Sequence, residues 1–276
     1  MSNFLSRLAV TIVAIGCFAT AQSSPVELTV NGGNKVTADI ELAGGIEADF
    51  TITFEDVIGL DDNSIGLTAE VIDITDTSIL NRLPSSLNTN LLSAFPMLIT
   101  VEPPSTEGLS FSGLVTVDIH THNLEYTVGT PLRLFKAPLG GQFKDITMTM
   151  GSGSYRARGT TGKFSQFLIL ADLRLATTVV TAKMNNLSTT LSNFSSQMSS
   201  ATYTSLNAKL NEVQQLITQQ SYVQASNKVN EFNQLVEAAS GTDIPNVWRS
   251  SRDIDNVAGE LIALANTLRF SLRLIN

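Results

Sequence analysis

The segment VTAKMNNLSTTLSNFSSQM, residues 180–198, carries apolar side chains at intervals of four, three, four, three and four residues. This spacing places them on one side of an α-helix, so it predicts an amphipathic helix that needs a packing partner. The segment lies within residues 163–240, which contain neither glycine nor proline to interrupt a helix. The apolar positions are Val180, Met184, Leu187, Leu191, Phe194 and Met198.

Three later segments repeat this spacing and supply the partners. Gly241 and Pro245 separate the last two of them, as expected between a helix end and the next helix start. We therefore expect residues 173–276 to form an antiparallel helical bundle of four helices. The alternative is a three-helix bundle whose first helix lies on the preceding domain. The apolar positions are Leu206, Leu210, Val213 and Ile217, then Val229, Phe232, Val236 and Ala239, then Ile254, Val257, Leu261, Leu264 and Leu268.

Residues 22–172 have a different character, because sixteen of the eighteen glycines lie at or before Gly162. Residues 46–54 alternate between apolar and polar side chains, which is typical of a half-buried strand, and similar short runs recur as far as residue 172. This pattern predicts an antiparallel β-sandwich of immunoglobulin-like topology. The leucine-rich residues 78–95 predict a short helical insert. The fold class is therefore expected to be α+β.

The N-terminus resembles a signal peptide over residues 1–21. A short apolar run ends at Phe18, and Ala19-Thr20-Ala21 offers small residues to a signal peptidase. We expect export to the periplasm or the extracellular space. Lipidation at Cys17, the only cysteine, is the weaker alternative, because the leucine usual three residues earlier is missing.

The net charge of the chain limits the classes of molecule that it is expected to bind. The formal net charge is -8, and no cluster of Lys or Arg interrupts it. Nucleic acid and anionic membrane surfaces are therefore not expected partners. No later segment approaches the ~20 apolar residues of a membrane-spanning helix. The polar faces of the predicted helices are rich in Ser, Thr, Asn and Gln, which is typical of a solvated surface and alternatively suits a protein or glycan partner.

The segment Asp118-Ile119-His120-Thr121-His122 contains both histidines of the chain. On a strand, Asp118, His120 and His122 project from the same face, where two imidazoles and a carboxylate suit a metal ion such as zinc. The simpler interpretation is that the three polar side chains face water.

A second acidic group suits calcium, because calcium prefers oxygen ligands. It lacks the twelve-residue loop and terminal glutamate of a helix-loop-helix calcium site, so a solvated turn is the alternative. The group comprises Glu55, Asp56, Asp61, Asp62 and Asn63.

Four segments resemble a group of secreted proteins of Gram-negative bacteria that is known only as a domain of unknown function. That group has no assigned catalytic residues, so the resemblance assigns none to this chain. The segments are AFPMLI at 94–99, DIHTHNL at 118–124, SYRARG at 154–159 and FSQFLI at 164–169.

These features favour a non-enzymatic exported protein that acts by binding or assembly at or outside the cell envelope. One alternative is a metal-dependent hydrolase that uses Asp118, His120 and His122 together with carboxylates from neighbouring strands. Another is an adhesive or self-assembling surface protein. No cofactor is expected other than zinc or calcium.

Overall fold

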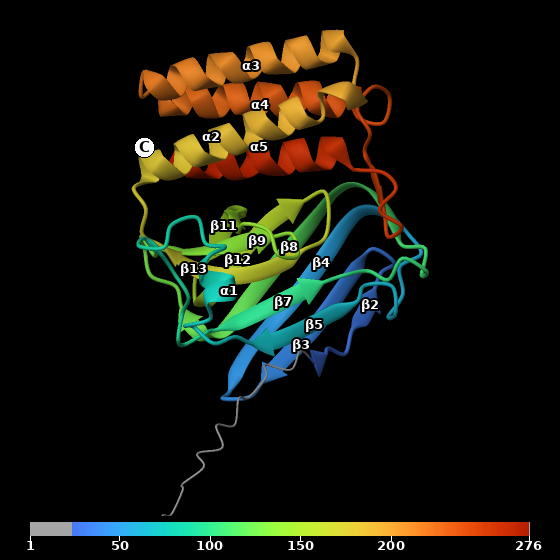
Figure 1. Ribbon diagram of the computed structural model, residues 1–276, viewed down its shortest axis with the longest axis vertical. Coiled ribbons are helices and arrows are strands. Elements are labelled where there is room, and N and C mark those ends of the chain that lie inside the picture. Colours follow the sequence, from blue (N-terminus) through green and yellow to red (C-terminus); the bar gives the residue numbers. More distant parts are fainter. Residues whose placement is uncertain (1–23, 276) are drawn as a thin grey trace, which may run out of the picture.

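A computed structural model describes residues 24–275 as a layer of helices stacked on two β-sheets (Figure 1). The predicted signal peptide, residues 1–21, and Cys17 lie outside the described residues. Within the described part of the chain, every helix is too short or too polar to cross a membrane.

The first sheet, sheet A, is antiparallel and has seven strands in the order β1-β5-β7-β13-β9-β10, with β6 paired to β13. Its strands are β1 (Ser24–Pro25), β5 (Leu67–Val71), β6 (Thr89–Asn90), β7 (Met97–Val101), β9 (Leu132–Ala137), β10 (Lys144–Asp145) and β13 (Gln166–Asp172).

The second sheet, sheet B, is also antiparallel, with the order β11-β12-β8-β4-β3-β2 and β14 paired to β8. The strands are β2 (Thr29–Asn31), β3 (Lys35–Leu42), β4 (Ile46–Ile58), β8 (Ser110–Glu125), β11 (Thr147–Gly151), β12 (Ser154–Thr161) and β14 (Val247–Arg249).

Both sheets contribute to one core, and in sheet B apolar side chains alternate with polar ones along the long strands. In β4, Phe50, Ile52 and Phe54 are buried, whereas the residues between them are half-exposed. Phe50 lies against Phe167 of sheet A, with ring centroids 6.2 Å apart. The expected alternation in residues 46–54 is confirmed, and the strand continues to Ile58.

The described helices are α1 (Thr77–Leu80), α2 (Ala176–Asn193), α3 (Ser200–Thr218), α4 (Tyr222–Ala239) and α5 (Val257–Leu274), with a short 3₁₀ turn at Ser195–Gln197. Helix α5 contacts α2 and α4, α4 contacts α3, and α5 also lies on β8, β11 and β12 of sheet B. The mixed α+β class is therefore confirmed, and α2–α5 follow β13 in the chain, with the short strand β14 between α4 and α5.

Three details differ from the sequence-based expectations. Ile254, predicted on the apolar face of the last helix, precedes α5, which begins at Val257. The predicted apolar face is buried from Val180 to Leu191, but α2 ends at Asn193, so Phe194 and Met198 lie outside the helix and are only partly buried. In the predicted insert, residues 78–95, the helix is limited to α1, which ends at Leu80, and the two-residue strand β6 follows.

The chain returns from the helices to sheet B before α5 begins. Strand β14 pairs with β8, where Trp248 lies opposite Phe111. The indole stacks on the Phe111 ring with centroids 5.2 Å apart and meets Phe164 edge-on at 5.3 Å. Trp248 is therefore part of the core between the sheets, although it comes from the predicted helical region.

Candidate metal centre

The two histidines lie on the outer face of sheet B, where β4 and β8 are neighbours. Antiparallel pairing sets Asp49 of β4 directly opposite His120 of β8, so the two side chains project from the same face. His122 follows His120 by two residues and points to the same side, as the strand period requires. The imidazole centroids are 5.3 Å apart.

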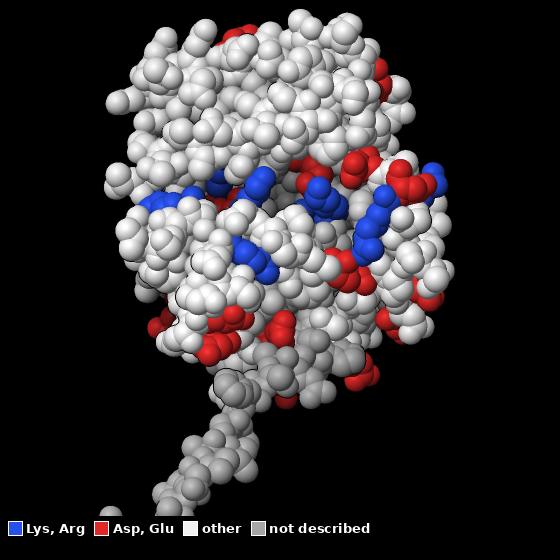
Figure 2. Space-filling view, viewed as in Figure 1, with Lys and Arg blue, Asp and Glu red and all other residues white. Residues whose placement is uncertain are grey.

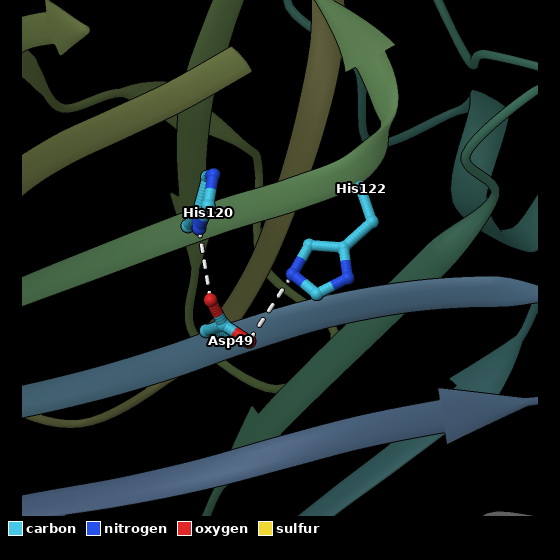
Figure 3. A group of neighbouring side chains, drawn as sticks. All are labelled: Asp49, His120 and His122. Carbon is cyan, nitrogen blue, oxygen red and sulfur yellow. Dashed lines mark hydrogen bonds and ion pairs between the residues drawn. The ribbon is translucent and has the colours of Figure 1, made fainter. Parts of the chain in front are cut away.

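Asp49 lies between the two imidazoles (Figure 3). Its Oδ2 is 2.8 Å from His120 Nδ1, and its Oδ1 is 3.2 Å from His122 Nε2. The second nitrogen of His122, Nδ1, is 3.4 Å from Glu47 Oε2. Both imidazoles are thus held by carboxylates of the neighbouring strand.

Asp118 has other partners, so the structure brings only two of the three predicted ligands together. Its Oδ2 lies 2.8 Å from Arg158 Nη2, and its Oδ1 lies 3.6 Å from Arg156 Nε, both from β12. The carboxylate that joins His120 and His122 comes instead from Asp49, which the sequence pattern did not single out.

More negative charge lies beside this cluster, because the β3–β4 pair aligns acidic residues. Asp39 is directly opposite Asp49, and Glu41 is directly opposite Glu47. Like charges that face each other across two strands destabilise a sheet. A bound cation would relieve this repulsion.

The electrostatics of the cluster follow from these contacts. The hydrogen bond to Asp49 raises the pKa of His122 above its ordinary value of 6.5, and Glu47 adds to this effect. Partial burial by itself raises the pKa of Asp49, but the hydrogen bonds to His120 and His122 outweigh it, so the net pKa lies below 3.8. The carboxylate is therefore ionised over the whole neutral range and is available as a ligand.

The distances are compatible with a metal ion after small side-chain rotations. One ligand atom from each of Asp49, His120 and His122 lies within 4.8 Å of the other two. Tetrahedral zinc with bonds of about 2.1 Å separates its ligand atoms by about 3.4 Å. Two imidazoles and a carboxylate are a common zinc ligand set, and they leave a fourth position open.

A shallow groove of 440 Å³ continues from Asp49 and His120 along the outer face. Its walls include Lys35, Arg156 and Arg158, so the cationic side chains lie beside the acidic cluster. Any molecule bound at the candidate metal position would face these cations.

In the acidic group predicted for calcium, several carboxylates accept hydrogen bonds from the chain itself. Asp61 Oδ1 accepts from the backbone of Asn63 and Ser64 at 2.8 and 2.9 Å. Asp56 accepts from Ser112 Oγ at 3.0 Å, and Glu55 accepts from the Leu114 amide at 2.9 Å. The Asp61 contacts are typical of a turn stabilised by an aspartate side chain, whereas those of Asp56 and Glu55 join β4 to β8.

The fold and the site together define a mixed α+β protein with a histidine and carboxylate cluster on an open sheet face. The chain belongs to the Family of unknown function (DUF6689), whose model matches residues 9–276. No curated protein and no solved structure matches the chain.

Proposed function

We propose that this protein is exported and acts as a non-enzymatic binding or assembly protein, and that the outer face of sheet B binds a divalent transition metal such as Zn²⁺. The observation that carries the proposal is the position of Asp49 between His120 and His122, at 2.8 and 3.2 Å. Imidazole ligands favour zinc over calcium, which prefers oxygen ligands alone.

Calorimetric titration with ZnCl₂ tests the metal site. The expected result is one site with a micromolar or lower Kd, weakened at least about tenfold in Asp49→Asn, because the amide keeps the shape but removes the anionic ligand. Asp118→Asn is the matched control on the same face and is expected to bind like the wild type. Equal loss in both variants, or no binding by the wild type, would contradict the proposal.

A metal-dependent hydrolase is the second candidate, and the groove beside the cluster favours it. Lys35, Arg156 and Arg158 can attract an anionic substrate toward a metal-bound water. The zinc-loaded protein would then hydrolyse p-nitrophenyl phosphate, and Asp49→Asn would abolish this activity. Zinc binding without turnover would favour the binding function.

Export rests on the N-terminal sequence. Expression of the full chain in a Gram-negative host, followed by fractionation and N-terminal sequencing, tests it. A mature chain beginning at Gln22 outside the cytoplasm is expected. A lipid-modified chain beginning at Cys17 would favour the lipoprotein alternative, and an intact cytoplasmic chain would refute export.

We further propose that the two sheets form an immunoglobulin-like β-sandwich and that α2–α5 form an antiparallel four-helix bundle, with the boundary near residue 172. The support is that the sheets share one apolar core and the helices share another. An experimental structure tests the strand order and the helix directions.

A further inference from the structure

A second candidate site lies on the seam between the helices and the sheets. A cavity of 450 Å³, open to solvent at one side, is lined by residues of β9, β10 and β12 and of α2 and α5. Its volume falls within the ~300–1,000 Å³ range of small-molecule sites. Figure 2 shows Lys and Arg side chains gathered along the seam between the two layers.

The charge of this cavity is opposite to that of the whole chain. Its lining includes Lys136, Lys144 and Lys163 and a single carboxylate, Glu260. Three cations and one anion leave an excess of two positive charges, whereas the chain carries a net charge of -8. The excess indicates an anionic ligand.

The ion pairs within the cavity do not neutralise all three lysines. Glu260 Oε1 lies 3.2 Å from Lys136 Nζ, and Oε2 lies 3.5 Å from Lys163 Nζ. Lys144 lies directly opposite Lys136 in the β9–β10 pair, an arrangement of like charges that destabilises a sheet. Among the described residues, no carboxylate forms an ion pair with Lys144.

An unsatisfied hydroxyl points to the same ligand. Thr160 lines the cavity, is only 5% exposed, and its Oγ1 has no hydrogen-bond partner among the described residues. A buried hydroxyl without a partner costs free energy, because it has lost its hydrogen bonds to water. Because Oγ1 itself is shielded from solvent, the Thr160 side chain must rotate before a ligand oxygen in the cavity restores one.

Part of the remaining wall is apolar, and the polar residues of that wall are Gln142, Thr161, Thr190 and Asn193. Ile146 and Ala263 are buried, and Phe194 and Leu264 are partly buried against the helical core. A bare inorganic anion would leave this surface without a partner. A ligand with an acidic head and an apolar body would fill both parts of the cavity.

We propose that this cavity binds a small amphiphilic anion, with its carboxylate or phosphate head at Lys144, Lys163 and Thr160 and its apolar body against Ile146, Phe194 and Leu264. The state of Glu260 supports this assignment. Burial by itself raises the pKa of Glu260, but Lys136 and Lys163 outweigh it and lower the pKa to about 2. The carboxylate therefore stays ionised and neutralises only one of the three lysines.

Calorimetric titration of the full chain with octanoate and with octyl phosphate tests the proposal, and octan-1-ol serves as the neutral probe. At least one anion is expected to bind about tenfold or more tightly than the alcohol, because a charged hydrogen bond contributes at least that factor. The tighter of the two anions identifies the head group. Equal affinity for the alcohol and both anions would overturn the proposal.

Two substitutions test whether the ligand binds in the cavity. Lys144→Gln is expected to weaken binding of the preferred anion about tenfold, whereas Lys228→Gln, at a surface lysine of α4 outside the cavity, leaves it unchanged. Thr160→Val preserves the shape and removes the unsatisfied hydroxyl, so it is expected to weaken binding while the ligand-free protein melts at the same or a higher temperature. Unchanged affinity in both Lys144→Gln and Thr160→Val would overturn the proposal.

Discussion

Lys183 Nζ lies 2.6 Å from Asp145 Oδ2, and the two side chains are only 5% and 3% exposed, so a buried ion pair joins α2 to β10. The same ammonium donates to Thr267 Oγ1 at 2.6 Å and to Ser271 Oγ at 2.8 Å, both on α5. One lysine therefore links two helices to sheet A.

Removal of this lysine is expected to destabilise the whole protein. Lys183→Met leaves Asp145 buried without its counter-charge, which costs about 3–5 kcal/mol of the free energy of unfolding. Urea unfolding measures the loss. Lys228→Met, which removes only surface ion pairs, one with Glu212 of α3 and one with Glu231 of its own helix α4, serves as the control and is expected to behave like the wild type. Equal midpoints for both variants would contradict this role.

The fluorescence of Trp248 tests whether the helices and the sheets unfold together. It is the only tryptophan, and it lies in the core between the sheets, whereas the far-ultraviolet circular dichroism signal comes mainly from α2–α5. Because β14 and Lys183 tie the helices to the sheets, both signals are expected to change at the same urea concentration. Two separate transitions would show that the helices and sheets unfold independently.

Zinc affinity is expected to depend on pH through His122. The contact with Asp49 raises the pKa of His122, so this contact stabilises the metal-free protein fully below about pH 6.5 and ceases to do so as the pH rises through the raised pKa. A metal requires the neutral imidazole, so zinc affinity has the opposite dependence.

Titration with zinc between about pH 8 and about pH 5.5 measures this effect. Affinity is expected to fall by up to about tenfold for each pH unit below the pKa of His122. Asp118→Asn is expected to follow the wild-type curve. An affinity that does not vary over this range would exclude His122 as a ligand.

Asp39 offers a test of the repulsion beside the cluster. Asp39→Asn removes one of two carboxylates that face each other across β3 and β4, so the metal-free protein is expected to gain about 0.5 kcal/mol of stability. Zinc binding is expected to weaken slightly, because the local negative charge decreases. Thermal melts with and without zinc measure both effects, and a lower melting temperature without zinc would contradict the argument.

Periodicity predicted much of this fold because it reports on one element at a time. The apolar face of α2 and the alternation in β4 were both evident from spacing alone. Pairing between strands is a different matter, since alternation within β4 does not say which strand lies beside it or in what register. For this reason the sequence predicted His120 and His122 on one face, but it could not identify Asp49 as their neighbour.

The sequence pattern did not predict the buried ion pair between Lys183 and Asp145, for a related reason. Lys183 precedes the apolar Met184 on α2, but its type gives no sign of burial, because lysine is rarely buried without a partner. Its partner, Asp145, is distant in sequence, and no local pattern connects them. Strand β14 is three residues long and lies between two helices, so its spacing carried no strand signal.

The return of the chain to sheet B through β14 also affects the order of assembly during synthesis. Phe54, Phe111 and Phe164 emerge from the ribosome well before Trp248, because translation proceeds from the N-terminus. The aromatic cluster between the sheets therefore stays open to solvent until nearly the whole chain has been made. A nascent chain that stalls before residue 247 would expose these rings and an unpaired segment of β8, which makes it a natural target for chaperones.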